Sequence, residues 1–312
     1  MAFCHPDSIL RSRLDELSRL LPGVRDANVD AVHDARVVTR RLRELLPIGG
    51  ASDPASADAL VSIRLAGRAM GKVRELDVVH ALLDDLDARA TFARRALADV
   101  RSDVRAAQAK ARRYMLKELE RLKLESLEAQ LRRRDRPFAA SRLHFGSRWP
   151  HRLGARIGER AAVLGESLQR VTGVYMPNRS HAARVAVKKL RYALEIADET
   201  GLWPAPDPTR ALRRAQATLG DMHDLQVLAD RIEQTVPDTG DVREWTWLRD
   251  LLQGDIARQH RRFVERRDRL ETAVSTCLRW AGPTPSRWSP RSFVKPLAVS
   301  AAVFSILARP HR

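Results

Sequence analysis

The sequence predicts an all-α chain whose two halves repeat each other. The same basic pattern occurs at residues 32–43 and 180–191 of the 312-residue chain. At about 100° per residue, each copy places cations on one side of a helix and apolar residues on the other. No run of alternating β-branched residues is long enough to indicate a sheet. The duplication therefore predicts helical halves that share a two-fold, cationic binding surface.

Each half is expected to begin with a leading helix, at about residues 7–21 and 151–171, followed by the basic helix. The apolar side of the first basic helix contains Val38 and Leu42, and that of the second contains Ala186 and Leu190. The cationic sides correspond position by position, and they consist of His33, Arg36, Arg40, Arg41 and Arg43, and of His181, Arg184, Lys188, Lys189 and Arg191.

A row of like charges has a cost in a helix. Arg36, Arg40 and Arg43 repel one another by a few tenths of a kcal/mol per pair unless an anion lies across them. One basic helix is usually a solvated surface, but drift would erase a merely solvating pattern in one of two copies. The histidines can serve as structural hydrogen-bonding residues, yet they continue the arginine row. We therefore interpret the row as an anion-binding surface.

The third helix of each half carries a start signal and an internal glycine. Asp53–Pro54 and Asp207–Pro208 fit an Asp N-cap followed by Pro at the first helical position. Gly71 and Gly220 cost up to about 1 kcal/mol each relative to Ala in a helix. We expect a close backbone approach or a kink at both glycines.

A long charged fourth helix is expected to close each half, at about residues 88–133 and 242–276. The stretch 135–150 contains Pro and Gly and is typical of a connection. The predicted organisation is a first helical half at 1–136, a second half at 137–280, and a Pro-rich linker with a short apolar segment at 281–312.

The chain resembles the CHAD family, the conserved histidine α-helical domain, over about residues 8–277. The resemblance rests on the two basic helices, on LGDMHDLQVL at 219–228, and on its counterpart MGKVRELDVV at 70–79. It implies two pseudo-symmetric four-helix bundles that enclose a basic cleft or channel. It also implies binding of inorganic polyphosphate and association with polyphosphate granules. Glu75 stands where an Asp is more usual, which affects only a local ion pair.

The resemblance makes the cationic sides of both basic helices the polyphosphate-binding candidates. A second tier of candidates comes partly from the resemblance, at Arg74 and His223, and partly from basic residues that could extend the track, at Arg64, Arg68, Lys72, Arg213 and Arg214. No catalytic residue, metal site or cofactor is expected.

Nucleic acid is the strongest alternative ligand. The formal net charge of +17 attracts polyanions of any kind. Grooves for single strands usually interleave aromatic residues that stack on bases, however, and Tyr192 is the one aromatic beside the basic rows. A polymer with phosphates and no bases fits better, so we expect nucleic acid only as a non-specific competitor.

An enzyme is the weaker alternative. His223–Asp224, with His181 and Asp250 or Asp255, would suit a metal-dependent phosphohydrolase. A metal site needs several convergent ligands, and the first-half counterpart of the pair is Arg74–Glu75. The prediction is therefore a binding protein without catalytic activity.

The remaining features concern the compartment and the C-terminal segment. Cys4 and Cys277 lack metal-ligand spacing and fit a reducing cytosol, and the N-terminus lacks a secretion signal. The apolar segment 297–308 is too short for a bilayer, which needs about 20 residues. It is expected to dock on the helices, with membrane-surface or partner docking, including recruitment of granule proteins, as alternatives. We expect a cytoplasmic protein at polyphosphate granules, without a transmembrane segment.

Overall fold

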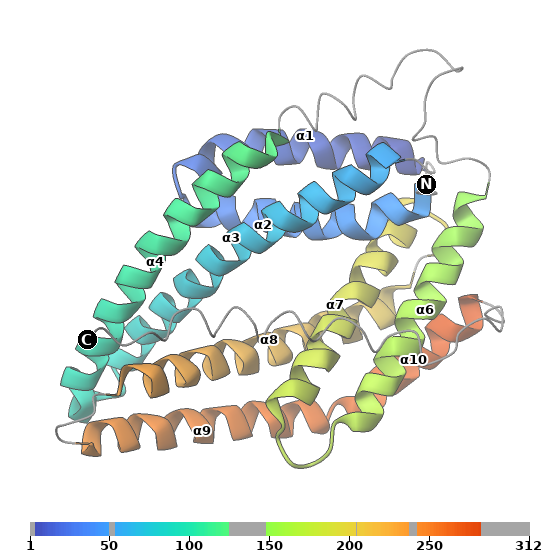
Figure 1. The fold of residues 1–312 in the computed structure, drawn as a ribbon. Helices are drawn as coiled ribbons and strands as arrows, with labels where there is room; N and C mark the ends of the chain where they lie inside the picture. Colours follow the sequence, from blue (N-terminus) through green and yellow to red (C-terminus); the bar gives the residue numbers. More distant parts are fainter. Residues whose placement is uncertain (1–3, 50–53, 125–147, 204, 237–241, 282–312) are drawn as a thin grey trace. The chain divides into compact units, whose positions relative to one another are not determined.

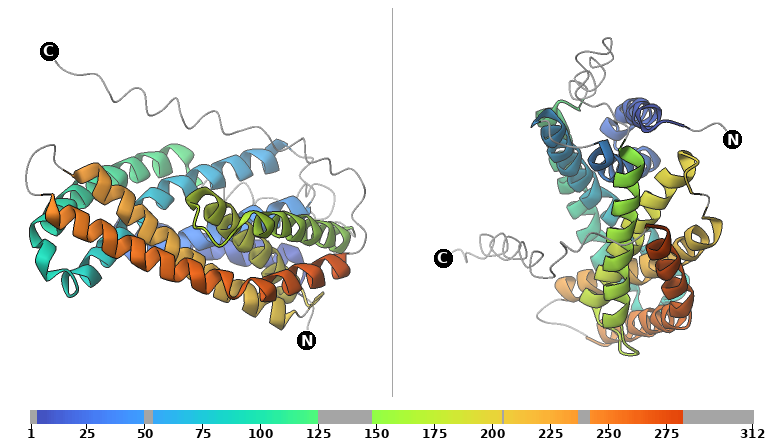
Figure 2. Two further views of the ribbon diagram at one scale, coloured as in Figure 1. Left: turned by 90° about the horizontal axis from the view of Figure 1, so that it is seen from below. Right: turned by 90° about the vertical axis from the view of Figure 1, so that its right-hand side faces the viewer.

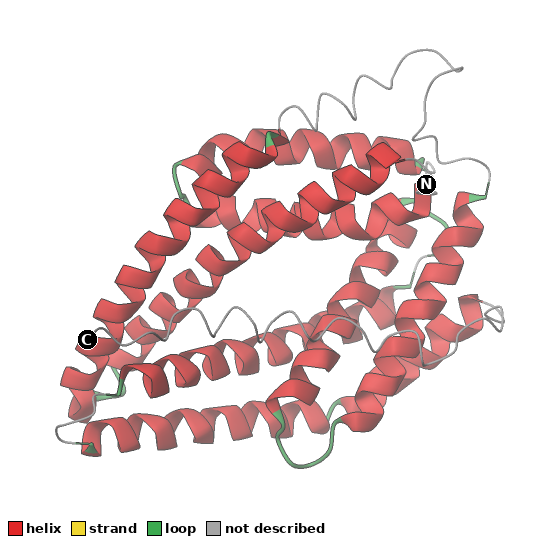
Figure 3. Cartoon of the chain, in the orientation of Figure 1, coloured by secondary structure: helices red, strands yellow, loops and turns green. Residues whose placement is uncertain are grey.

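The described part of the chain consists of helices joined by short turns (Figures 1 and 3). The structure is a computed structural model, and it describes residues 4–49, 54–124, 148–203, 205–236 and 242–281. Within these ranges there is no strand, so the all-α prediction is confirmed. The segment 297–308 lies outside the described residues.

The first half contains the four expected helices in the expected order. They are α1 (Pro6–Arg25), α2 (Val29–Leu45), α3 (Pro54–Asp87) and α4 (Arg94–Leu122), with short 3₁₀ turns at Leu46–Gly49 and Thr91–Ala93. Each helix packs against the next one in sequence. The basic helix α2 therefore lies between its leading helix α1 and the long helix α3.

The second half repeats this order but ends differently. Its helices are α6 (Trp149–Arg170), α7 (Pro177–Glu199), α8 (Pro206–Thr235), α9 (Arg243–Val264) and α10 (Arg267–Ala281). The single helix expected at 242–276 is wrong, because the chain bends between α9 and α10 (Figure 2). Arg267 donates a hydrogen bond to the Val171 carbonyl at 3.0 Å, and α10 then packs against α6 as well as α8. The chain therefore changes direction after α9, and α10 buries its apolar face against α6.

The start signal of the third helix is only partly correct. Helix α8 begins at Pro206, with Ala205 as the N-cap, so Asp207 lies inside the first turn instead of capping it. Pro206 has no backbone N–H to satisfy and a fixed φ, which suits it to the first helical position. Asp53 lies outside the described residues.

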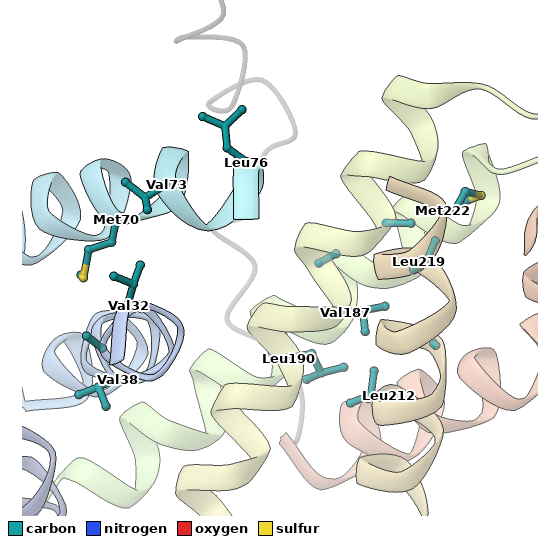
Figure 4. Close-up of a cluster of buried hydrophobic side chains, with 14 of the residues drawn as sticks. Val32, Val38, Met70, Val73, Leu76, Val187, Leu190, Leu212, Leu219 and Met222 are labelled. Atoms are coloured by element: carbon teal, nitrogen blue, oxygen red, sulfur yellow. The ribbon is translucent and has the colours of Figure 1, made fainter. Parts of the chain in front are cut away.

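The apolar sides of both basic helices are buried, as predicted. Val38 and Leu42 of α2 are fully buried, as is Leu190 of α7. Figure 4 shows Val187 and Leu190 of α7 pointing toward Leu212 of α8. Burial of one such side chain stabilises the fold by about 1.5–3 kcal/mol. The buried sides fix the rotation of each helix and turn its cations away from the core.

Contacts also join the two halves within the compact unit Met1–Gly282. Helix α2 contacts α7, and α3 contacts α8. The two copies of the basic helix are therefore neighbours in space, which positions the site described below.

A buried carboxylate ties α2 to α6. Glu44 is 6% exposed, and its Oε2 accepts hydrogen bonds from Arg156 Nε at 2.9 Å and from Arg160 Nε at 3.2 Å. Removing one partner of such a buried group leaves the other charges uncompensated. Glu44 therefore reduces the repulsion between these two guanidinium groups.

We expect Glu44→Gln to lower the free energy of unfolding by about 3 kcal/mol, because Arg156 and Arg160 lose their buried counter-charge and keep only the longer ion pairs with Glu159, at 3.9 and 3.5 Å. Urea unfolding measures the change. Glu166→Gln is the control, since Glu166 is 47% exposed and pairs loosely with Arg170 at 4.0 Å. Its effect should stay below about 0.5 kcal/mol, and equal losses in both variants would contradict the role of Glu44.

Candidate anion-binding site

One pocket of about 480 Å³ collects cations from both basic helices and from α3. We call it the basic pocket. Its cationic lining consists of Arg36, Arg40, Arg43, Arg68, Lys72, His181, Arg184, Lys188 and Lys189. Glu44, Glu75 and Tyr192 complete its polar and aromatic lining. The structure thus brings the predicted rows of the two halves together around a single space.

The basic pocket follows from helix geometry. Residues spaced by three or four share one side of a helix, so Arg36, Arg40 and Arg43 are neighbours on α2. Arg184 and Lys188 have the same relation on α7. Because the opposite sides of both helices are buried and α2 contacts α7, the two rows line the same pocket.

Lys188 is the clearest sign of crowded positive charge. Burial lowers the pKa of Lys188 to about 6, and the nearby charges of Arg184, Arg40 and Arg36 act in the same direction. Only Asp224 opposes them among the main contributors. The Lys188 amine is therefore largely uncharged at neutral pH until an anion arrives.

The arginines show the same effect. Burial and the Arg40 charge lower the pKa of Arg36 to about 10, and Arg36 Nη1 donates to the Gly67 carbonyl at 3.0 Å. Burial also lowers the pKa of Arg43 and Arg184. Within the described residues, the cations of the basic pocket from α2 and α7 form no ion pair with a carboxylate. A bound anion would supply the negative charge that these cations lack.

The three histidines of the predicted site all have lowered pKa values, which favours their neutral form. The rings of His181 and His223 lie 5.3 Å apart between centroids. Burial and the charges of Arg184 and of neighbouring cations lower the pKa of His223 to about 3, and burial also lowers that of His181. His33 is exposed and does not line the basic pocket. Partial burial and the Arg74 charge lower its pKa as well.

Two of the predicted cations, Arg41 and Arg191, are paired with a carboxylate of the protein. Glu195 accepts a hydrogen bond from Arg41 Nε at 3.4 Å and forms a short ion pair with Arg191. Arg191 Nε also donates to Gln216 at 2.8 Å, and its guanidinium lies 4.5 Å above the Tyr192 ring. Neither arginine lines the basic pocket. Glu195 follows Arg191 by four residues, a compensating spacing that the repeat comparison overlooked.

The second-tier candidates do not all lie at the basic pocket. Arg68 and Lys72 line the basic pocket, and the Arg64 charge acts on the neighbouring Arg43. Arg213 is exposed and lines none of the pockets described. Arg214 lines a different pocket, between α8 and α10. The predicted track therefore continues along α3 but not to Arg213 and Arg214.

The repeat pattern missed cations on another helix. Burial lowers the pKa of Lys189, and the charges of Arg160, Arg43 and Arg156 add to this shift. Arg156 and Arg160 belong to α6 and are four residues apart, so they share one face. That spacing is visible in the sequence, but it has no counterpart in the first half to draw attention to it.

The two motif glycines differ. A Cβ on Gly71 would lie 1.9 Å from Arg36 Nη1, so the close approach expected there is confirmed. At Gly220 no described atom lies within 4 Å of an added Cβ, and the helix continues through it, so the expectation is wrong at that position. Gly71 makes room for the Arg36 side chain, whereas Gly220 faces open space.

We expect Gly71→Ala to weaken anion binding by about tenfold, because the new methyl group displaces the Arg36 guanidinium and a charge-assisted hydrogen bond is lost. Gly220→Ala is the matched control and should raise stability by about 0.5–1 kcal/mol with unchanged affinity. Thermal unfolding and titration of both variants test this. Equal affinities of the two variants for the anion would show that anion binding does not depend on the position of Arg36.

The phosphohydrolase alternative requires four residues, of which the structure brings together His181 and His223 but not the carboxylates. His223 lines a small pocket at the start of α7, whereas Asp224 lines another one with Asp221 and Asp255. Asp255 is bound by Arg89 Nη1 at 2.9 Å. Within the described ranges, no group of three or more His, Cys, Asp or Glu side chains is placed to hold a metal ion.

None of the described helices is both long enough and apolar enough to span a membrane.

Comparisons with known proteins give a family and a fold. A family model described as the CHAD domain matches residues 8–233. The crystal structure of the CHAD domain from the plant Ricinus communis is similar, with a TM-score of 0.60 and 23% identity, covering 86% of this chain and 90% of that one. PptA from Streptomyces chartreusis has a TM-score of 0.58 and 14% identity, covering 88% and 97%. The search of curated proteins gives no match.

Proposed function

The chain belongs to the CHAD family, and from this premise we propose that it binds inorganic polyphosphate in the basic pocket. The observation that carries the proposal is the meeting of Arg36, Arg40, Arg184 and Lys188 in one partly buried space, where none of them forms an ion pair with a carboxylate of the described residues. Polyphosphate supplies a closely spaced row of negative charges that relieves this repulsion. Guanidinium groups bind phosphate oxygens in bidentate geometry and remain charged, which suits such a polymer.

The pocket favours a phosphate polymer over nucleic acid. Its one aromatic side chain, Tyr192, is 3% exposed, so its ring offers no surface on which a base could stack. Nucleic acid would retain only phosphate contacts, which fall steeply with salt. We propose that it competes weakly and without sequence preference.

The arrangement of the helices supports a shared cleft. We propose that α2 and α7 are equivalent walls contributed by pseudo-symmetric bundles, and that the basic pocket is the central part of the cleft between them. Arg68 and Lys72 of α3 would extend the cationic lining along one wall. The chain then acts as a binding protein that holds the polymer without cleaving it.

The net charge of +17 supports a place on a strongly anionic particle. We propose that the protein is cytoplasmic and associates with polyphosphate granules through the basic pocket. The two free cysteines, Cys4 and Cys277, are compatible with a reducing compartment.

Amide hydrogen exchange of the full chain, free and with long-chain polyphosphate, tests the location of the site. Protection is expected on α2, α7 and the part of α3 around Gly71, because these segments line the basic pocket. Helix α9 lies outside the pocket and serves as the internal reference. Protection confined to the α8–α10 surface near Arg214 would overturn the proposed location.

A further inference from the structure

A smaller pocket adjoins the basic pocket at the beginning of α7. We call it the end pocket; its volume is about 170 Å³, and Asn178, Ser180, His223 and Asp230 are among its lining residues. His181 lines both pockets, and its ring lies 5.3 Å from that of His223 between centroids. The two pockets therefore meet at His181.

The N-terminus of α7 presents donors to the end pocket. The helix is 23 residues long, starts at Pro177, and has no side-chain cap from Met176. Asn178 lines the end pocket, and its N–H group has no acceptor within the helix, because only later residues can reach a carbonyl four positions back. The aligned peptide dipoles add partial positive charge at this end. An anion placed there would satisfy both effects.

A second observation is independent of the helix end. Ser180 lines the end pocket and is 4% exposed, and its Oγ has no hydrogen-bond partner in the described part of the chain. A buried hydroxyl without a partner costs free energy, so native proteins rarely leave one unsatisfied. The oxygen of an anionic ligand would be a partner for this group.

We propose that the end pocket binds the terminal phosphate of a polyphosphate chain whose following phosphates occupy the basic pocket; this inference rests on the proposed function. A terminal phosphate has three unlinked oxygens and bears up to two charges, whereas an internal phosphate has two unlinked oxygens and one charge. The donors at the beginning of α7, Ser180 Oγ and the imidazole N–H groups of His181 and His223 match the additional oxygen. The small volume of the end pocket suits a chain end.

One carboxylate opposes the ligand. Asp230 Oδ1 accepts a hydrogen bond from Gln226 Nε2 at 2.7 Å, and Gln226 Oε1 accepts one from the Tyr175 hydroxyl at 3.1 Å. This chain of hydrogen bonds holds the carboxylate on the α8 side of the pocket. Asp230→Asn should therefore tighten binding of chains with free ends, because it removes a repulsion and preserves the shape.

The test compares short-chain polyphosphate with free ends and the same polymer with both ends converted to methyl phosphoramidates. Wild-type protein should bind the free-ended polymer about tenfold more tightly, as expected for loss of hydrogen bonds to a charged group. In Ser180→Val this preference should disappear, with both polymers binding as the capped one binds to wild type. Ser180→Ala should reduce the preference without filling the pocket. Ser18→Val is the control, because Ser18 Oγ on α1 is also buried and unpartnered.

The outcomes separate this inference from the proposed function. Equal affinity of wild-type protein for capped and free-ended polymers would overturn the end pocket and leave the basic pocket standing. A preference that persists in folded Ser180→Val and Ser180→Ala would overturn it as well. If neither polymer binds at low salt, polyphosphate is not the ligand and the proposed function itself fails.

Discussion

Replacing Arg40 and Lys188 together with glutamine is expected to weaken polyphosphate binding by at least about a hundredfold. The two side chains belong to opposite walls of the basic pocket, and each loses a charge-assisted contact of about 1.5–3 kcal/mol. Titration of the purified variant at constant salt measures the loss. The double variant Arg213→Gln and Arg214→Gln removes two basic side chains from outside the basic pocket and should lose much less affinity.

The Lys188→Gln change alone should stabilise the free protein. The unfolded chain binds a proton on Lys188 up to its ordinary pKa of about 10.4, whereas the folded protein binds it only below about 6. Stability of the free protein is therefore lost as the pH falls through this interval, and Lys188→Gln removes that loss. At pH 7 the variant should unfold a few degrees higher than wild type. A lower unfolding temperature together with weak binding would indicate a damaged fold instead.

Binding of polyphosphate at pH 8 is expected to take up about one proton per protein molecule, contributed by Lys188. The free amine is uncharged there, because its pKa is about 6, and a bound polyanion raises that pKa. Affinity should accordingly fall as the pH rises above 6, by up to about tenfold per pH unit. Calorimetric titration in two buffers with different ionisation enthalpies counts the protons.

Lys188→Gln controls for protons taken up by the polymer or by His181. Proton uptake at pH 8 should be close to that of the polymer alone in this variant, and the pH dependence should flatten. An uptake that is unchanged in the variant would contradict the assignment to Lys188, whatever the affinity.

The helices and the cationic rows could be predicted because both depend on local periodicity. The burial of Val38 and Leu190 follows from the spacing of apolar residues, and that spacing also fixes the direction of Arg40 and Lys188. The duplication then predicts which charged side forms the binding site. Gly71 was recognisable for the same reason, since a glycine within a helix is costly unless something needs the space.

Features that depend on neighbouring helices could not be predicted in this way. Glu44 occupies the position that corresponds to Tyr192, so comparing the repeats hides its role as the buried partner of Arg156 and Arg160 on α6. The bend between α9 and α10 has no Pro or Gly at it and results from packing against α6. A helical wheel gives the side on which Arg214 lies, but not that this side lines the pocket between α8 and α10.

The most direct test is a calorimetric titration of the full chain with long-chain polyphosphate, beside single-stranded DNA of matched charge, at two salt concentrations. The account predicts tight polyphosphate binding that persists at the higher salt, where DNA binding has largely gone, because the basic pocket offers cations but no exposed aromatic ring for bases. The slope of log K against log salt should be about −0.7 per phosphate contact if polyphosphate behaves as a single strand does. Equal affinities that fall together with salt would mean a general polyanion surface and would contradict a selective polyphosphate site.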